Sequence, residues 1–203
     1  MGSAEPPVAD RELRIVQHSA ARTRVLDAAL DLFAQHGVSG TSLQMIADAV
    51  GITKAAIYHQ FRTKDNVVLA VTERELGRLA PALEEAEAHG DELQARDQLL
   101  VRVIEMAVRD RRLVRTLQFD PVVVRLLAEY EPFQRFMERL YRVLLGDTGD
   151  DGRIEGAMLS GAISSAVMHP LVADVDDNTL LTKLTDMSRR LLGLRSKPIA
   201  GAS

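Results

Sequence analysis

The chain has 203 residues, 46% of them hydrophobic and 27% charged, so it can bury a substantial core as one domain or two. It contains no cysteine, which excludes disulfides, thiol catalysis and zinc sites with thiolate ligands. It has no run of about 18 uncharged apolar residues and no apolar segment typical of a secretory signal, so we expect neither a membrane span nor a cleaved leader.

Charge is distributed unevenly along the chain. The formal net charge is −4. Residues 11–74 contain eight Lys or Arg and six Asp or Glu, whereas residues 75–203 contain 17 basic and 21 acidic residues. The acidic total therefore does not exclude a polyanionic partner, because the N-terminal third is locally basic.

The N-terminal residues predict a tail followed by helices. Residues 1–18 begin with a Pro- and Ala-rich stretch and are predicted to form a flexible tail or arm. Apolar residues then recur at spacings of three and four, which predicts a helix from Ser19 to Gly37. A short second helix follows, with Thr41 or Ser42 as its cap.

Further helices are marked by caps and by apolar periodicity. Thr53 caps a third helix and Thr63 a fourth, which Pro81 must kink or break because proline lacks an N–H. No segment alternates with the period of a strand, so the predicted fold class is all-α. The later predicted helices cover residues 93–108, 111–119, 122–130, 133–145, 153–169 and 178–192.

Residues 42–61 contain two short helices joined by the sequence VGIT. Gly51 permits the tight turn that sets two helices at the steep angle of a helix-turn-helix. Ile57 and Phe61 lie on one face of the second helix and can fill the wedge toward the first helix. The side chains that would then face outward are Lys54, Ala55, Tyr58, His59 and Arg62.

This outward face has the chemistry of a DNA recognition helix. A small residue such as Ala55 permits close approach to the major groove, and Lys54 can reach a guanine edge or a phosphate. Tyr58 and His59 can donate hydrogen bonds to phosphates. Surface packing and a catalytic Tyr–His pair are the alternatives, but adjacent helical residues point about 100° apart and do not face one another.

The segment from Arg22 to Val71 resembles the N-terminal domain of the TetR family of bacterial transcriptional regulators. One departure is Gln60, where His or Tyr is usual; whether His59 or Gln60 would contact DNA stays open. The residues that match the family pattern are Phe33, Gly37, Thr41, Ile46, Ala47, Gly51, Ile52, Thr53, Ile57, Tyr58, Phe61 and Lys64.

The resemblance implies a three-helix helix-turn-helix DNA-binding domain at residues 19–66. It also implies a helical effector-binding and dimerisation domain at residues 67–198, with a flexible tail at residues 199–203. The two heads of a homodimer would enter major grooves about 34–36 Å apart. The expected DNA contacts are Thr41, Ser42, Gln44, Thr53, Lys54, Ala55, Tyr58, His59 and Lys64.

The C-terminal part supplies candidates for an effector pocket and a dimer interface. A pocket needs apolar residues with a few polar groups, and no charged handle is evident. The pocket candidates are Met106, Phe119, Tyr130, Phe133, Met137, Tyr141, Met158 and His169. Small residues on one predicted helix and an apolar stripe on the last suggest a four-helix bundle between subunits. The interface candidates are Gly156, Ser160, Gly161, Ser164, Leu180, Leu184, Met187 and Leu191.

We therefore expect a cytoplasmic bacterial regulator without enzymatic activity, associated with the nucleoid when bound to DNA. It would repress transcription from a palindromic operator and be released by a small, largely apolar effector. The five histidines are scattered, so we expect no metal site, and no cofactor. A regulator controlled by a protein partner, or lacking an effector, is the main alternative, and an all-α enzyme or lipid carrier is a further one.

Overall fold

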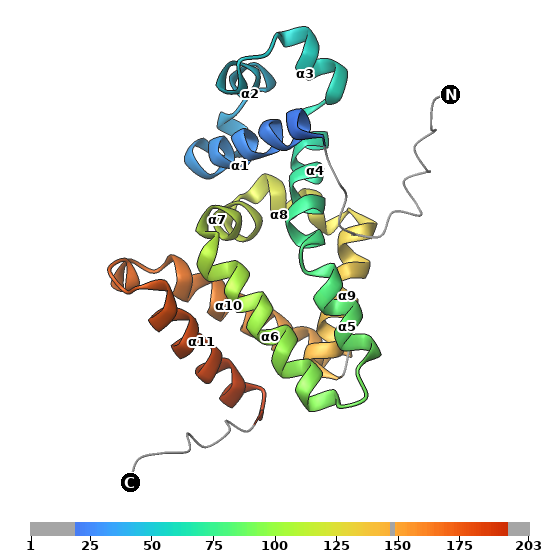
Figure 1. Cartoon of the computed structure of the whole chain (residues 1–203), viewed down its shortest axis with the longest axis vertical. Helices are drawn as coiled ribbons and strands as arrows, with labels where there is room; N and C mark the ends of the chain where they lie inside the picture. The colour runs from blue at the N-terminus through green and yellow to red at the C-terminus, as the bar shows by residue number, and fades with distance from the viewer. Residues whose placement is uncertain (1–18, 147–148, 195–203) are drawn as a thin grey trace. The chain divides into compact units, whose positions relative to one another are not determined.

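The computed structural model describes residues 19–146 and 149–194, and every regular element within these ranges is helical (Figure 1). The predicted tails at residues 1–18 and 199–203 lie outside the described residues. The all-α prediction is confirmed. Within these ranges the helices form two compact units: one runs to Pro81 and takes in Arg112–Arg139, and the other comprises Ala82–Arg111 and the chain from Leu140 onward.

The first unit is built on four N-terminal helices, α1 (Ala20–Gly40), α2 (Leu43–Val50), α3 (Lys54–Gln60) and α4 (Lys64–Gly77). Both α2 and α4 pack against α1, and α3 packs against α2 (Figure 1). The core of this part is aliphatic with two phenylalanines. Its fully buried side chains include Val25, Leu26, Leu30, Phe33, Ile46, Ile57, Phe61, Val67 and Val71.

Local caps explain where these helices begin. The hydroxyl of Ser42 accepts the backbone N–H of Met45 at 3.2 Å, and Thr53 does the same for Ala56. Thr63 and Asn66 form a reciprocal capping box at the start of α4. The predicted caps of α3 and α4 are confirmed, and Ser42 is the cap of α2.

Two breaks differ in detail from the sequence prediction. Gly37 has a φ of 71°, which interrupts α1 as expected, but helical residues continue to Gly40. Helix α4 ends at Gly77, before Pro81, and α5 (Ala80–Ala88) begins a new helix. Pro81 therefore lies in the first turn of α5, where its missing N–H is not needed.

The first unit also contains α7 (Arg111–Phe119) from Arg112 onward, α8 (Pro121–Ala128) and the start of α9 (Glu131–Leu145). Helix α8 contacts both α1 and α4. The compact units are thus divided at other residues than the predicted functional parts, because a segment far along the chain packs on the N-terminal helices. The division into functions at residue 66 stays a prediction.

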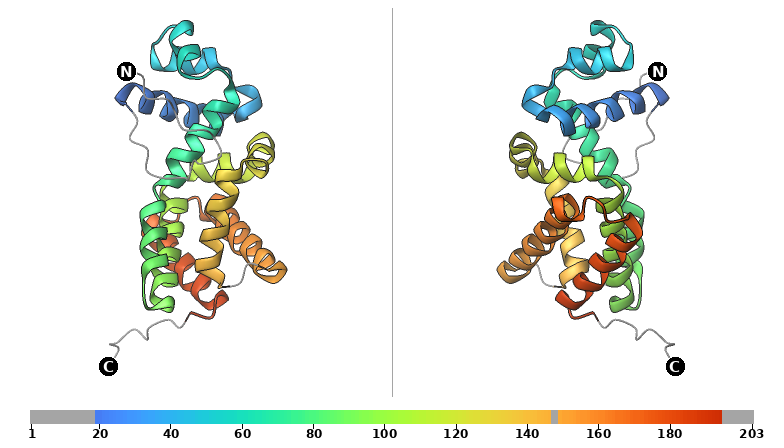
Figure 2. Two further views of the ribbon diagram at one scale, coloured as in Figure 1. Left: turned by 90° about the vertical axis from the view of Figure 1, so that its right-hand side faces the viewer. Right: turned by 90° about the vertical axis from the view of Figure 1, so that its left-hand side faces the viewer.

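The second unit is centred on α6 (Glu92–Arg109), which packs along α11 (Asp177–Leu191) and also contacts α10 (Asp150–Met168) (Figure 2). A short 3-10 helix at Pro170–Val172 joins α10 to α11. Arg189 binds both carboxylate oxygens of Asp97 at 2.6 and 2.8 Å, and this hydrogen bonding raises the pKa of the arginine. The ion pair fixes the end of α11 on α6.

Candidate nucleic-acid interface

The turn between α2 and α3 has the geometry of a helix-turn-helix. Gly51 ends α2 with a φ of 75°, and an added Cβ there would meet no atom within 4 Å. The backbone N–H of Ile52 donates to the carbonyl of Ala47 at 3.0 Å, and that of Gly51 donates to Asp48, which is a Schellman motif. Glycine is therefore needed here for its backbone conformation rather than for space.

Helix α1 supports this turn with two arginines. The guanidinium of Arg24 donates to the carbonyl of Val50 at 3.0 Å, the last residue of α2. Arg22 lies over the ring of Phe61 at 4.6 Å from the centroid, a cation–π contact next to the end of α3. Sequence reasoning missed both arginines, because their partners lie 26 and 39 positions away and no local pattern indicates them.

Helix α3 has one buried face and one exposed face. Ile57 and Phe61 are 0% and 2% exposed, which anchors α3 on the core as predicted. The outward residues named from the sequence, Lys54, Ala55, Tyr58, His59 and Arg62, are all exposed. The exposed face of α3 contains no carboxylate side chain of its own segment, because no Asp or Glu occurs between Ala49 and Lys64.

The structure distinguishes His59 from Gln60. His59 is exposed, whereas Gln60 is partly buried and its Oε1 atom is shielded without a hydrogen-bond partner. Of the two side chains, that of His59 is the more exposed.

The predicted contacts near the start of α2 separate into different environments. Thr53, Ser42 and Gln44 are exposed, and Gln44 donates to Asp48 at 2.7 Å. Thr41 is buried at 2% exposure, and its hydroxyl donates to the carbonyls of Gly37 and Leu32 within the same subunit. Its side chain therefore does not reach the exposed surface.

Lys64 lies at the start of α4 and is half-buried. Its ammonium group donates to the carbonyl of Thr41 at 2.9 Å and approaches that of Ser39 at 3.5 Å. The lysine thus binds the turn between α1 and α2, a role that its sequence position did not indicate. An ammonium has three donors, so one N–H remains available for a further acceptor.

The eight pocket candidates are divided four and four between the two units. Phe119, Tyr130, Phe133 and Met137 belong to the first unit, and Met106, Tyr141, Met158 and His169 belong to the second. Phe119 and Met158 are exposed. The hydroxyl of Tyr130 donates to Glu73, and Nδ1 of His169 accepts the backbone N–H of Leu171 at 3.2 Å, so both atoms take part in bonds within the fold.

Tyr141 has a defined environment in the second unit. It is hydrogen-bonded to Ser160, and its ring lies against Gly156, where an added Cβ would come within 3.2 Å. Burial raises the pKa of the Tyr141 phenol above its ordinary value. Gly156 therefore packs against Tyr141 inside the subunit.

The interface candidates also separate by exposure. Gly156, Ser164, Leu180 and Leu184 are buried inside one subunit, and Ser160 is half-buried, so these side chains are largely covered before any partner binds. Gly161, Met187 and Leu191 are exposed. Exposed apolar residues that sequence reasoning did not assign to an interface, Ile154 and Met158, lie on α10 as well.

Other kinds of site find no support in the described ranges. Within residues 19–146 and 149–194, no three His, Asp or Glu side chains are grouped so as to bind a metal ion. Over the same part of the chain, no helix combines the length and the apolar character needed to span a bilayer.

Comparison with known proteins points to the same segment. Residues 25–71 match the family model described as bacterial regulatory proteins, tetR family. The chain is 40% identical over 94 residues to the HTH-type transcriptional regulator AcrR of Shigella flexneri, which covers 45% of this chain and 43% of that protein. It is 32% identical over 80 residues to the repressor AcnR of Corynebacterium diphtheriae, covering 39% and 40%. The matches thus span less than half of these relatives' lengths.

Solved structures extend the likeness of fold to most of the chain. The fatty acid degradation regulator FadR from Bacillus halodurans has a TM-score of 0.67 and 19% identity, covering 90% of this chain and all of that one. FadR from Bacillus subtilis in complex with stearoyl-CoA has a TM-score of 0.64 and 17% identity, covering 85% and 96%. At these identities the likeness concerns the fold alone.

Proposed function

We propose that this chain is a transcriptional regulator of the TetR family that binds operator DNA, a proposal supported by the match of residues 25–71 to that family's model. The observation that carries the proposal is the exposed, carboxylate-free face of α3 above the buried anchors Ile57 and Phe61. Such a face can enter a major groove without repelling the phosphates on either side.

The contacting groups follow from their exposure. Lys54, Ala55, Tyr58 and His59 line the outward face of α3. Ser42, Gln44 and Thr53 contribute polar groups at the starts of α2 and α3, and backbone N–H groups there can bind phosphates. Lys64 adds its remaining N–H at the edge, whereas the buried hydroxyl of Thr41 makes no contact.

The regulator acts as a repressor that binds a palindromic operator as a dimer. AcnR and several other relatives carry the word repressor in their names, which supports this direction of control. Such a protein works on the bacterial chromosome, and hence in the cytoplasm and at the nucleoid.

We also propose that a small, largely apolar effector releases the repressor from DNA. The FadR neighbour from Bacillus subtilis was solved with stearoyl-CoA, and this chain shares its fold. Five of the eight pocket candidates are purely apolar or aromatic side chains without a polar atom other than sulfur: Met106, Phe119, Phe133, Met137 and Met158. Control by a protein partner is the competing proposal, and screening acyl-CoA esters for release of bound DNA distinguishes the two.

The proposal is tested by selecting duplexes from a random DNA pool and measuring affinity for the selected sequence against salt concentration. Tyr58→Ala should weaken binding to all duplexes by about tenfold, since it removes a phosphate donor and ring contacts. Leu93→Ala is the control, because Leu93 is 64% exposed on α6 and lies outside α3, α10 and α11. Unchanged binding by Tyr58→Ala, or weaker binding by Leu93→Ala, would contradict the assignment.

A further inference from the structure

The turn between α1 and α2 is attached to two charged side chains that come from later helices. It begins at Gly37, with its φ of 71°, and leads to Ser42, the exposed cap of α2. Lys64 binds two carbonyls of this turn. The backbone N–H of Val38 donates to the carboxylate of Asp120 at 2.7 Å, across 82 positions of sequence.

Asp120 uses its two carboxylate oxygens for two different elements. Oδ1 accepts the N–H groups of Val122 and Val123 at 2.9 and 3.3 Å and thereby caps α8. Oδ2 accepts the N–H of Val38 and lies 3.3 Å from where a Cβ on Gly37 would be. Gly37 is therefore required both for its positive φ and for the close approach of Asp120.

We infer that Asp120 is a positioning residue for DNA binding, which fixes the turn before α2 by bonding the Val38 N–H while it caps α8. The inference rests on the proposed function. The partly buried carboxylate forms a charge-assisted hydrogen bond, which is stronger than a neutral one. Without it, the turn that presents Ser42 and Gln44 loses the acceptor for one of its backbone groups, and more conformations become accessible to it.

The chain contains a matched control for this dual role. Asp91 caps α6 with the same pattern, since its Oδ1 accepts the N–H groups of Leu93 and Gln94, each at 3.1 Å. Among residues 19–146 and 149–194, the Asp91 carboxylate bonds only within its own cap. Serine is a good helix cap but has one oxygen on a shorter side chain, so Asp120→Ser preserves the cap of α8 while removing the bond to Val38.

The structural half of the inference is tested by amide hydrogen exchange, measured by NMR on the full chain. Asp120→Ser should speed exchange of the Val38 amide by about tenfold or more, the equivalent of a lost charge-assisted hydrogen bond. Asp91→Ser should leave Val38 unchanged. If Asp120→Ser proves unfolded, Asp120→Thr serves instead, since its single hydroxyl also caps a helix but does not supply the second oxygen that binds the Val38 N–H. Unchanged exchange of Val38 in the folded variant overturns the inference.

The functional half uses the selected duplex. Asp120→Ser should lower DNA affinity by several-fold while leaving the slope of affinity against salt concentration unchanged, because no phosphate contact is removed. Asp91→Ser should bind as the unaltered chain does. If Asp120→Ser binds DNA as tightly as the unaltered chain, the positioning role of Asp120 is overturned, while the proposed function in DNA binding stands. If the unaltered chain selects no duplex, both the proposed function and the positioning role fail.

Discussion

Lys54 and Lys64 carry the same charge but have different surroundings. Lys54 is exposed on α3, with its ammonium 5.7 Å from the centre of the Tyr58 ring. Lys64 is bonded to the carbonyl of Thr41, and so to the turn before α2. A free lysine in the first turn of a recognition helix can reach base edges, whereas a lysine fixed at the rim can only meet the backbone of DNA.

Replacing each lysine with alanine should therefore give two different results. Lys54→Ala should alter the sequence preference, with a loss of about tenfold on the selected duplex and a smaller loss on variants changed at one base pair. Lys64→Ala should weaken binding to all duplexes by a similar factor and reduce the salt slope by about one. Sequencing the pool bound by each variant makes the comparison; an unchanged preference in Lys54→Ala would exclude base contact.

At the residue scale, the sequence predicts most of α3 and leaves its neighbours undetermined. The order of buried Ile57 and exposed Tyr58 follows from helical periodicity, and the structure agrees. The burial of Thr41 could not be predicted from the sequence, because a threonine before a helix is typical of a cap. Its hydroxyl instead points inward and donates to carbonyls of α1. The difference in exposure between His59 and Gln60 likewise does not follow from the sequence pattern.

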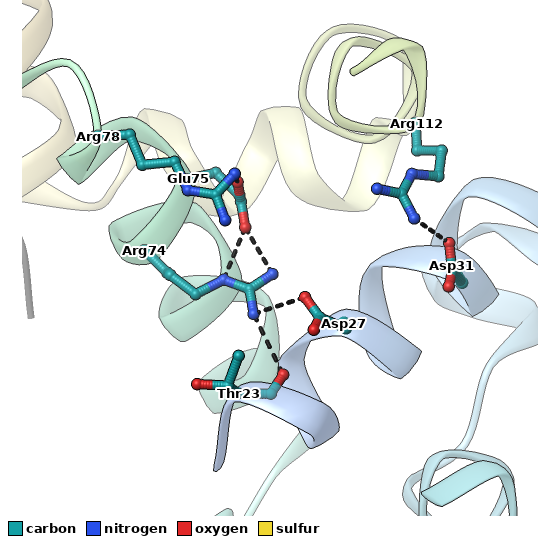
Figure 3. Close-up of polar contacts among 7 residues, drawn as sticks. All are labelled: Thr23, Asp27, Asp31, Arg74, Glu75, Arg78 and Arg112. Carbon is teal, nitrogen blue, oxygen red and sulfur yellow. Dashed lines mark hydrogen bonds and ion pairs between the residues drawn. The ribbon is translucent and has the colours of Figure 1, made fainter. Parts of the chain in front are cut away.

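At the scale of elements, α1 and α4 are joined by a cluster of charges around two buried side chains, those of Arg74 and Glu75 (Figure 3). Arg74 of α4 donates to the carbonyl of Thr23 at 3.2 Å and pairs with Asp27 at 2.9 Å, both on α1. It also pairs with Glu75, which is 1% exposed and is bound by Arg78 at 2.7 Å. Apolar periodicity identifies the contact face of α4 but gives no sign that charged residues are buried on it.

Removing one member of this cluster should cost more than removing the pair. Arg74→Met should lower the free energy of unfolding by about 2 kcal/mol, because Glu75 loses its buried partner and keeps only the exposed Arg78. The double variant Arg74→Met/Glu75→Leu should recover much of this loss, since no buried charge is left unpaired. Urea denaturation measures both. Arg102→Met is the control, as its pair with Glu105 lies at the surface and should contribute close to nothing. A double variant less stable than Arg74→Met would contradict the explanation.

Several ends of the helices could be predicted from the sequence, because their signals are local. Caps and turns such as Gly51, Thr53 and Thr63 act through bonds within three or four residues, so their signals are local in sequence. The bond from Asp120 to Val38 spans 82 positions, and neither residue type suggests the other. Local interactions thus allow the helices to be predicted from the sequence, whereas the contacts between helices far apart in the chain become known only from the structure.

At the scale of the whole molecule, the small-residue pattern on α10 serves two different faces. Gly156 and Ser164 point into the subunit, whereas Gly161 is exposed. On α11, Leu180 and Leu184 are buried, and Met187 and Leu191 are 59% and 57% exposed. We call the exposed residues Met158, Gly161, Met187 and Leu191 the α10–α11 face. Of the candidate residues for the dimer, only the exposed ones remain available to a partner, because the others are buried or half-buried inside the subunit.

Charges placed on this face should separate the dimer without unfolding the subunit. Met187→Glu/Leu191→Glu should give a monomer by light scattering at micromolar concentration, because burying unpaired carboxylates at an interface is costly. Affinity for a palindromic duplex should then fall by a factor on the order of 10² or more, since the second head no longer binds as part of the same molecule. Binding to a single half-site should persist, because α3 and its anchors are untouched.

The control for the dimer is Leu93→Glu, which places a charge on a leucine of α6 that is 64% exposed and lies outside α10 and α11. It should leave both the molecular mass and the DNA affinity unchanged. A monomeric unaltered chain would exclude the two-fold arrangement outright. A dimer that survives Met187→Glu/Leu191→Glu would show that the interface lies on another surface. The spacing of the two half-sites in the operator would then reflect the separation of two heads joined through that other surface.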